Sequence, residues 1–388
     1  MATRLSRPRQ WRHAESRRAV PARHHGARPG ALAARVWTRL VIANHHPLVS
    51  IILPCRNEER YIGACLDSIL ATAYPLDRLE ILVVDGMSED RTRDIVARRA
   101  DRHAAIRLLE NRRRITPAAL NMAIRAATGE IVVRMDAHVV YPREYLPGLV
   151  EALQASDADN VGGVIVTLPA DGTAVARAIA VALSHPFGVG NAYFRIGVGA
   201  PRWVDSVPFG CFRREVFERI GLFDEELVRN QDDEFNLRLI KHGGRILLLP
   251  EVLSYYFARR WLRDVARMYY QYGYYKPLVA KKLDRVMTLR QLVPGLFLLS
   301  LAGTAALGPW FHAARVAGAA IAGSYVVAVL GCVAGAVRHT GWRCALALAA
   351  VFPTLHFSYG FGTFRGVLHH VLQPRRNRRD PAMIPLSR

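Results

Sequence analysis

Charged and polar side chains follow three apolar runs in the first half of the chain, and their types suit a phosphate-binding site. Arg-Asn-Glu (56–58) follows the first run, Asp85 ends the second, and Asp136 ends the third, with His138 two positions further on. Carboxylate oxygens are hard ligands for Mg²⁺ or Mn²⁺, and such an ion can neutralise phosphate oxygens. Imidazole is also acceptable to Mn²⁺. The pattern allows a metal site with a substituted ligand, or a buried strand followed by an ordinary turn.

A second polar group, Gln-Asp-Asp-Glu (231–234), precedes an apolar-periodic stretch at 235–242 that ends at Gly243-Gly244. The spacing predicts a helix over 235–242. Adjacent carboxylates can raise the pKa of one of them, which suits a general base. Acidic residues at a helix N-terminus are also favoured by the helix dipole, so a purely capping role is the alternative.

Alternating strands and helices between residues 48 and 136 would bring the strand-end groups together. Continuous apolar runs predict three buried strands, the last two ending at Asp85 and Asp136, with helices near 59–71, from about 91, and over 117–127. This βαβαβ pattern predicts an α/β fold whose open, doubly wound sheet binds ligands at the carboxyl ends of its strands. Neither G-x-G-x-x-G nor G-x-x-x-x-G-K-[ST] occurs, which removes the main support for a dinucleotide or P-loop site.

The net charge of +21 is concentrated outside this region. Residues 1–47 contain ten Arg and one Glu without steady periodicity, which predicts a disordered basic tail, and residues 373–388 form a second basic tail. No nucleic-acid-binding motif is found, so we expect no nucleic-acid partner. The five cysteines form no C-x-x-C pair and no zinc spacing, which favours a reducing compartment.

The C-terminal part predicts membrane attachment. No acidic residue occurs between Arg285 and Arg379, and apolar runs at 291–311, 316–337 and 344–364 are each near the length that crosses a bilayer. We predict transmembrane helices within 288–372, two or three in number, because Pro353 and His356 interrupt the third run. A re-entrant or interfacial helix is the alternative there.

Charge asymmetry predicts the orientation of these segments. Lys and Arg before the first run place the N-terminal domain in the cytoplasm, and Arg338 and Arg343 agree as a second cytoplasmic loop. A third full crossing would leave the arginines of 375–379 on the far side, against the positive-inside rule.

Between the N-terminal domain and the apolar runs, the segment 257–287 is rich in Tyr, Trp, Lys and Arg, which predicts an amphipathic interfacial helix. A charged surface helix with a tyrosine core stripe is the alternative.

Four stretches in order resemble the motifs of the family 2 inverting nucleotide-sugar glycosyltransferases, which have the GT-A fold. They are SIILPCRNEE (50–59), ILVVDGMSEDRT (81–92), GEIVVRMDAH (129–138) and NQDDEFNLRLIKHG (230–243). Within that family the chain is most similar to the membrane-attached ExoA-type succinoglycan-biosynthesis enzymes, on the D-x-H of 136–138 and QYGYYK at 271–276. The resemblance covers about 48–275 and implies a GT-A domain, a Rossmann-like open mixed sheet with helices on both faces, over 48–256.

The resemblance also implies roles for the residues singled out above. Asp136 and His138 would hold Mg²⁺ or Mn²⁺, and His138 as a plain loop histidine is the alternative. Asp233 would be the catalytic base, with Asp232 at the first place of the pair, where the family has Glu. Asp85 would accept a hydrogen bond from the base or ribose, unless it only forms a turn. The nucleotide-sugar site would comprise Pro54, Arg56, Asn57, Glu58, Asp85, Ser88 and Asp136.

The function so implied is transfer of a sugar from a nucleotide-diphosphate sugar, a UDP-hexose such as UDP-glucose, with inversion. The acceptor would be a lipid-linked glycan or polysaccharide in exopolysaccharide or cell-envelope synthesis, at the cytoplasmic face of the inner membrane. The absence of Q-x-x-R-W favours transfer of single sugars, and 183–195 offers acceptor-binding side chains. The alternative is a non-catalytic, membrane-anchored nucleotide-sugar-binding scaffold.

Overall fold

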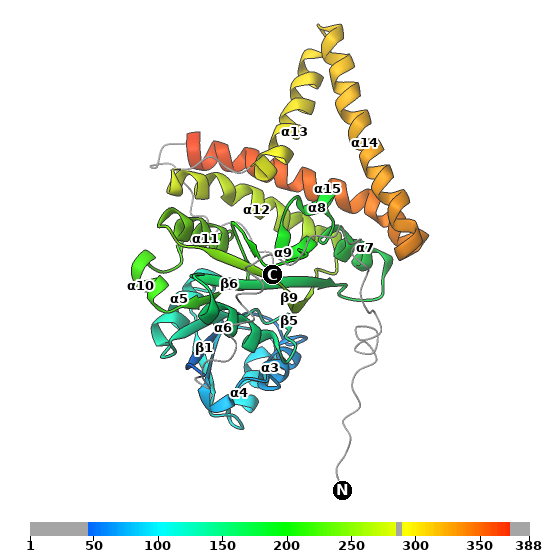
Figure 1. Cartoon of the computed structure of the whole chain (residues 1–388). Coiled ribbons are helices and arrows are strands. Elements are labelled where there is room, and N and C mark those ends of the chain that lie inside the picture. The colour runs from blue at the N-terminus through cyan, green and yellow to red at the C-terminus, as the bar shows by residue number, and fades with distance from the viewer. Residues whose placement is uncertain (1–45, 285–288, 373–388) are drawn as a thin grey trace. The chain divides into compact units, whose positions relative to one another are not determined.

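A computed structural model describes residues 46–284 and 289–372. Apart from residues 46 and 47, the basic tails predicted at 1–47 and 373–388 lie outside the described residues. Within them, one mixed β-sheet carries helices on both faces and is followed by four long helices (Figure 1). The predicted α/β class, an open mixed sheet followed by a helical C-terminal region, is confirmed.

The N-terminal half of the sheet is parallel and contains the three predicted strands. Its order is β3 (Ile106–Glu110), β2 (Leu79–Asp85), β1 (Val49–Cys55) and β4 (Ile131–Arg134). Every residue of β2 and β4 is buried, which is why the sequences of these strands are continuous apolar runs. The sequence motifs did not indicate β3, a short edge strand with exposed charges at Arg107 and Glu110.

The second half of the sheet is mixed, and its elements follow β4 in space. β8 (Cys211–Arg213) pairs antiparallel with β4 and with β6 (Asn160–Leu168), and β6 runs parallel to the long β9 (Ile246–Phe257). The two-residue strands β5 (Val139–Val140) and β7 (Arg202–Trp203) both pair with β9. This arrangement places β9 opposite the ends of the parallel strands.

Helices cover both faces because alternate strand residues point to opposite sides. Ile51 and Leu53 of β1 pack in one core cluster, whereas Ile52 packs in the other. The first cluster includes side chains of α3 (Ile62–Leu70), α4 (Thr92–Ala100), α6 (Tyr145–Ala155) and α7 (Ala174–Ala182). The second includes side chains of α5 (Thr116–Ala126), α10 (Glu215–Ile220) and α11 (Gln231–Lys241). A 3₁₀ turn, η1 (Leu76–Arg78), precedes β2.

A buried carboxylate ties three strands together at the amino end of β2. Glu80 accepts hydrogen bonds from Ser50 Oγ at 2.6 Å, from the Thr128 amide at 2.9 Å and from Arg107 Nη1 at 2.8 Å. Burial raises the pKa of Glu80, but these hydrogen bonds outweigh it and hold the pKa below 4.5. The ionised carboxylate is therefore the form that stabilises the fold.

Glu80→Gln should remove the part of the pH dependence of the free energy of unfolding that comes from this carboxylate. Because the folded pKa lies below the unfolded one, its contribution is complete above about pH 4.5 and is lost as the pH falls through the folded pKa. Glu80→Gln should cost about 1–3 kcal/mol at pH 7 and less in acid. Melting of the detergent-solubilised protein from pH 7 to pH 3 measures this. The control is Glu151→Gln on the exposed side of α6, and an equal loss in both variants would contradict the prediction.

Four long helices follow the sheet: α12 (Leu262–Leu283), α13 (Leu289–Leu307), α14 (His312–Thr340) and α15 (Trp342–Gly366), which continues as a π-helical turn, η2 (Val367–Leu372). The segments His312–Thr340 and Trp342–Leu372 are long and apolar enough to cross a membrane, and Gln291–Leu307 is a shorter apolar helix. The third run, which Pro353 and His356 interrupt, forms one helix, and whether it crosses the membrane stays a prediction. Its helix continues through the proline, and the first run is the shorter one.

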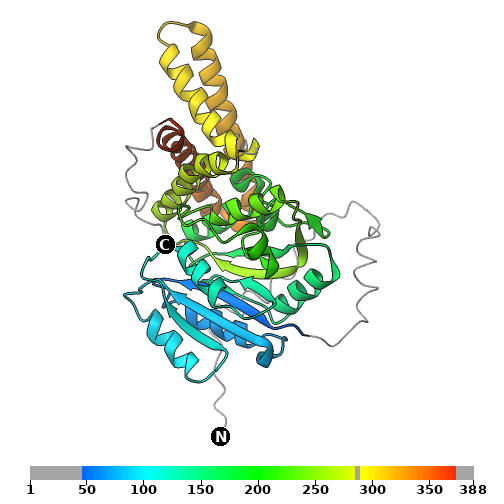
Figure 2. The ribbon, with the colours of Figure 1, turned by 90° about the vertical axis from the view of Figure 1, so that its left-hand side faces the viewer.

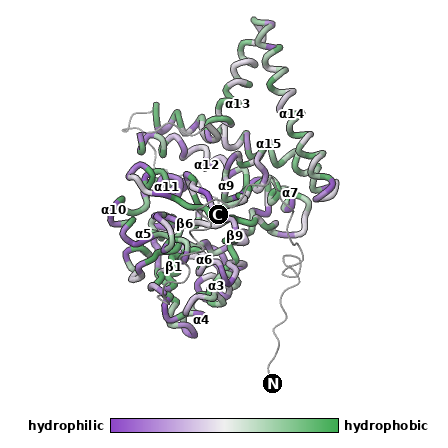
Figure 3. Tube along the Cα trace, viewed as in Figure 1, coloured by the Kyte–Doolittle hydropathy of each residue, from purple (hydrophilic) through white to green (hydrophobic). Residues whose placement is uncertain are grey.

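α13 and α14 form a hairpin that extends away from the sheet (Figures 1 and 2). Many residues along both of its helices are hydrophobic (Figure 3). Its exposed large side chains include Leu296, Leu299, Trp310, Phe311, Val316, Val327 and Leu330. A continuous exposed apolar surface of this kind is typical of contact with lipid.

α12 and α15 lie side by side at backbone contact (Figure 1). A Cβ added at Gly273 would lie 2.0 Å from the Tyr359 carbonyl oxygen, and one at Gly362 would lie 2.1 Å from that of Tyr270. Glycines at a crossing let two helices approach this closely. The glycines therefore fix α12 against α15.

This packing buries part of the tyrosine-rich segment 257–287, whose position at a membrane interface stays a prediction. Tyr274 and Tyr275 are 4% and 1% exposed, because α12 lies between α11 and α15 rather than on an open surface. The tyrosines thus form the core stripe that was the alternative interpretation. Neighbouring helices bury their rings, and composition alone does not reveal which helices will be neighbours.

Candidate active site

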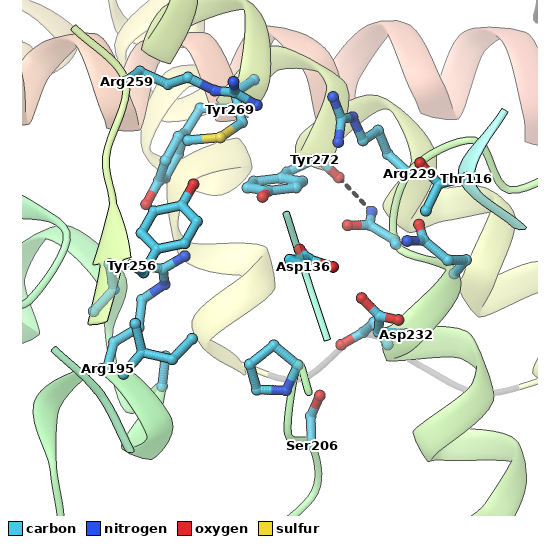
Figure 4. A pocket seen from close by; sticks show the side chains of 18 of the residues that line it. Thr116, Asp136, Arg195, Ser206, Arg229, Asp232, Tyr256, Arg259, Tyr269 and Tyr272 are labelled. Carbon is cyan, nitrogen blue, oxygen red and sulfur yellow. Dashed lines mark hydrogen bonds between the residues drawn. The ribbon is translucent and has the colours of Figure 1, made fainter. Parts of the chain in front are cut away.

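A cavity of about 1170 Å³ opens at the carboxyl ends of β1, β2 and β4 (Figure 4). Its other sides are formed by β9, α12 and two short helices, α8 (Pro186–Val189) and α9 (Tyr193–Ile196). Of the ten residues proposed from the sequence, eight line it: Pro54, Arg56, Asn57, Glu58, Asp136, His138, Asp232 and Asp233. The three strand ends and the group at 231–234 therefore converge on one space, as their positions in the chain predict.

Asp85 and Ser88 do not line this cavity. Asp85 is fully buried and accepts hydrogen bonds from the Ser88 amide at 2.9 Å and from the Ser88 hydroxyl. The Ser88 hydroxyl in turn accepts a hydrogen bond from the backbone N–H of Asn57 at 2.8 Å. The Asp85 carboxylate thus accepts hydrogen bonds within its own loop, and its contact with the base or ribose stays a prediction. The pair holds Asn57, whose φ of 53° is left-handed, at the cavity wall.

Arg134, which the sequence motifs did not single out, joins two of the acids. Its Nη2 lies 3.1 Å from Asp136 Oδ1, and its Nη1 forms an ion pair with Asp232. The side chain comes from the last residue of β4 and is almost completely buried. A charged residue closing an otherwise apolar strand, IVVR, was the signal that could have revealed it. Arg134 therefore fixes the position of Asp136 relative to α11.

Asp233 is held by Lys276, a residue of α12, through an ion pair between largely buried side chains. The helix predicted at 235–242 begins four residues earlier, so Asp232 and Asp233 lie in the first turn of α11. Its N-cap, Asn230, has a φ of 63° and donates a hydrogen bond to the Tyr272 carbonyl at 2.8 Å. α12 therefore holds both the start of α11 and its second carboxylate.

Glu234, the last acid of this group, takes no part in lining the cavity. It is 3% exposed and forms a bidentate pair with Arg238 one turn later, at 2.8 and 3.0 Å. The geometry thus leaves Asp232 and Asp233 as the acids of 231–234 that face a ligand.

The residues proposed for metal binding provide only part of a coordination shell. His138 Nδ1 is buried without a hydrogen bond, 3.4 Å from Glu58 Oε1. Within 46–284 and 289–372, no three His, Cys, Asp or Glu side chains form a group that could hold a metal ion. Mg²⁺ commonly binds through one or two carboxylates together with substrate phosphates and water. The side chain of Asp136 at the cavity wall fits an ion of that kind, completed by a ligand.

Cations outnumber acids around the cavity. Four acidic residues line it, namely Glu58, Asp136, Asp232 and Asp233, against eight cationic ones, namely Arg56, Arg113, Arg114, Arg134, Arg195, Arg229, Arg259 and Lys276. Such an excess of positive charge attracts anionic ligands. The chemistry of the cavity therefore suits a substrate that carries more than one phosphate.

One wall combines arginines and tyrosines and contains no acid. It is formed by Arg195, Tyr256, Arg259 and Tyr269, and we call it the Arg/Tyr wall (Figure 4). Burial raises the pKa of Tyr256 and of Tyr269, although Arg259 acts in the opposite direction on the first and Arg195 on both. Both phenols therefore stay protonated and can donate hydrogen bonds. Of this wall, the sequence had indicated Arg195, within 183–195, and the stretch 257–287, which contains Arg259 and Tyr269.

Comparison with known proteins identifies the family. Residues 50–221 match the model described as "Glycosyl transferase family 2". The chain is 31% identical over 246 residues to "Succinoglycan biosynthesis protein ExoA" of Rhizobium meliloti (strain 1021), covering 63% of this chain and 73% of that protein. It is 29% identical over 243 residues, 60% of this chain and 74% of the relative, to a Methanococcus voltae protein named "Dolichyl N-acetyl-alpha-D-glucosaminyl phosphate 3-beta-D-2,3-diacetamido-2,3-dideoxy-beta-D-glucuronosyltransferase".

A solved structure agrees with the sequence comparisons. The "Mannosyltransferase PcManGT from Pyrobaculum calidifontis in complex with GDP-Man and Mn2+" superposes with a TM-score of 0.52 at 25% identity, covering 84% of this chain and 93% of that one. Together with the strand-end motifs, these similarities confirm the expected family and the expected enzyme class. The chain belongs to the family 2 glycosyltransferases with the GT-A fold, the family that also contains ExoA.

Proposed function

We propose that this glycosyltransferase moves a single sugar from a nucleotide-diphosphate sugar, a UDP-hexose such as UDP-glucose, to a lipid-linked glycan acceptor with inversion. The observation that carries the proposal is the cavity, where four carboxylates face an excess of cations. The complex of the Pyrobaculum calidifontis mannosyltransferase with GDP-Man and Mn2+ supports a nucleotide-sugar donor and a divalent metal. The nucleoside would lie along Pro54–Glu58 at the end of β1, and Asp85 and Ser88 would hold that turn from behind.

Each acid then has one task in the proposed reaction. Asp136, oriented by Arg134, would hold Mg²⁺ or Mn²⁺ with His138 nearby, and the ion would neutralise the charge that develops on the leaving diphosphate. Asp233 would accept the proton of the acceptor hydroxyl, since inversion needs a base on the face opposite the leaving group. Lys276 would keep the Asp233 carboxylate aimed at that hydroxyl.

Sugar transfer in vitro tests the proposal. The full-length protein in detergent is incubated with Mn²⁺, single UDP- or GDP-sugars and a bacterial lipid extract, and both diphosphate release and sugar in the organic phase are measured. Lipid-dependent release with one donor is the expected result. Nucleotide binding without release for any donor would favour the non-catalytic scaffold instead.

The proposed membrane arrangement has α13 and α14 crossing the bilayer and α15 lying at its cytoplasmic surface. Support comes from α15 being buried along one side, at Leu348, Phe352 and Leu355, where it covers the catalytic domain. Its other side exposes Trp342, Leu346, Phe361 and Phe364. A helix with one protein-facing and one lipid-facing side suits the interface. Two crossings would also keep Arg338, Arg343 and the arginines of 375–379 on one side, as the positive-inside rule requires.

Reporter fusions in a bacterial host test this topology. A phosphatase that works only in the periplasm should be inactive when fused after residue 388 and active when inserted between Gly308 and Pro309, at the turn of the hairpin. A fluorescent protein that folds only in the cytoplasm should give the opposite pattern. Phosphatase activity at the C-terminal fusion would show that α15 crosses, and the surface assignment would be abandoned.

A further inference from the structure

We propose that the Arg/Tyr wall is a second anion-binding subsite, and that it takes the phosphate or diphosphate group through which a prenyl-type lipid carries the acceptor. This rests on the proposed function, because it specifies the acceptor of the same cavity. The wall adjoins the donor site at Tyr256, whose ring centroid lies 5.1 Å from that of His138, but it is built from other elements than the side chains assigned to the donor. Those come from the ends of β1 and β4 and from α11, whereas the wall comes from α9, the end of β9 and α12.

The two arginines of the wall lack anionic partners among the described residues. Arg195 forms one long hydrogen bond, 3.5 Å from Nη1 to Thr167 Oγ1, and its guanidinium lies 5.4 Å from the ring centroid of Tyr256. The Nε of Arg259 is buried without a hydrogen bond. The adjacent Arg260 differs, since it is exposed and pairs with Asp171 at 2.7 Å. Arg195 and Arg259 are half-buried, and an anionic ligand would supply the counter-charge that the described residues do not give them.

Phenol hydroxyls complete an anion-binding arrangement. Tyr256 and Tyr269 are drawn close together beside Arg195 in Figure 4, with Arg259 above them. The guanidinium of Arg195 lies over the Tyr256 ring, 5.4 Å from its centroid. Two guanidinium groups and two O–H donors match the several acceptor oxygens of a phosphate.

The same cavity continues onto an apolar floor supplied by the helices assigned to the membrane. Phe297 of α13, Tyr325 of α14 and Leu355 of α15 line it, together with Phe187 of α8. A free sugar phosphate or a nucleotide would gain little from such a floor. A phosphate attached to a hydrocarbon chain would use both features, with its head at the wall and its chain against the helices.

Binding of farnesyl diphosphate to the full-length protein in detergent tests the inference, with inorganic diphosphate, farnesol and UDP plus Mn²⁺ as comparison ligands. Arg195→Gln and Arg259→Gln should each weaken farnesyl diphosphate binding by about tenfold to a hundredfold, the loss of a charge-assisted contact. UDP binding should be unchanged. The matched control, Arg260→Gln, should alter neither. Removal of an unpaired cation should also leave the melting temperature equal or higher, which separates loss of binding from misfolding.

Two results would overturn the assignment. If Arg195→Gln and Arg259→Gln weaken UDP binding as much as farnesyl diphosphate binding, the wall belongs to the donor. If farnesyl diphosphate binds no better than inorganic diphosphate, the subsite recognises an anion but no lipid. Neither result depends on turnover. Failure of every nucleotide sugar to react would refute the proposed function while leaving arginine-dependent prenyl diphosphate binding in place.

Discussion

Asp233→Asn should abolish sugar transfer and leave nucleotide binding intact. The substitution keeps the size of the side chain but removes the proton acceptor, and general-base catalysis contributes about 10²–10⁴-fold to a rate. The uncharged amide would also no longer form the ion pair with Lys276, so it would lose the fixed orientation of the carboxylate. Turnover of the donor with the lipid extract, compared with UDP affinity in the same preparation, measures the effect.

Asp232→Asn is the comparison that locates the base. Asp232 faces the cavity from the same helical turn but is paired with Arg134, so its loss should disturb the position of Asp136 and weaken the donor complex. We therefore expect a mainly KM effect for Asp232→Asn and a kcat effect for Asp233→Asn. The opposite split would move the base by one residue, and a lowered melting temperature in either variant would identify a folding defect.

Asp136→Ala should remove the metal dependence of donor binding together with activity. Asp136 is the carboxylate at the end of β4, and an ion held there would depend on it, since no group of three metal-binding side chains exists in the described ranges. In the intact protein, Mn²⁺ should strengthen UDP binding and chelation should reverse this. In the variant, UDP should bind weakly and equally with and without Mn²⁺, as titration calorimetry would show.

His138→Ala provides the graded comparison for that experiment. The histidine lies beside Glu58, and its ring contacts Tyr256 edge-on, with centroids 5.1 Å apart. If it assists the ion, its loss should weaken the response to Mn²⁺ without abolishing it, and His138→Asp should shift the preference towards Mg²⁺. Full Mn²⁺ dependence in Asp136→Ala would show that the ion is held elsewhere.

The sequence predicted those elements whose own residues form a recognisable pattern. β1, β2 and β4 are buried on both faces, so their apolar runs are continuous, and the acids that end them mark the binding edge. The ion pairs that hold the acids of the site have no such pattern in the sequence. Arg134 and Asp232 are 98 residues apart, and Lys276 and Asp233 are 43 apart. Their pairing depends on how β4, α11 and α12 pack, which local patterns do not encode.

The C-terminal helices show the same limit. Hydropathy identified the three apolar runs, but it measures composition and not the neighbour that buries a side chain. Tyr274 and Tyr275 therefore suggested a bilayer interface, although α11 and α15 enclose them. That the members of the Arg/Tyr wall meet was not predicted for a related reason, because they come from three elements that come together only in the folded chain.

The glycine contact between α12 and α15 has a consequence for acceptor length. A junction without room for one methyl group at Gly273 or Gly362 prevents α12 from sliding along α15, so Lys276 and Asp233 stay at a constant height above the lipid headgroups in the proposed orientation. For the proposed lipid-linked acceptor, a constant height would favour glycans whose terminal hydroxyl reaches the Asp233 carboxylate over those one sugar shorter or longer. The enzyme would then count the sugars already built on its carrier, and a series of lipid-linked acceptors of increasing length would give one preferred size.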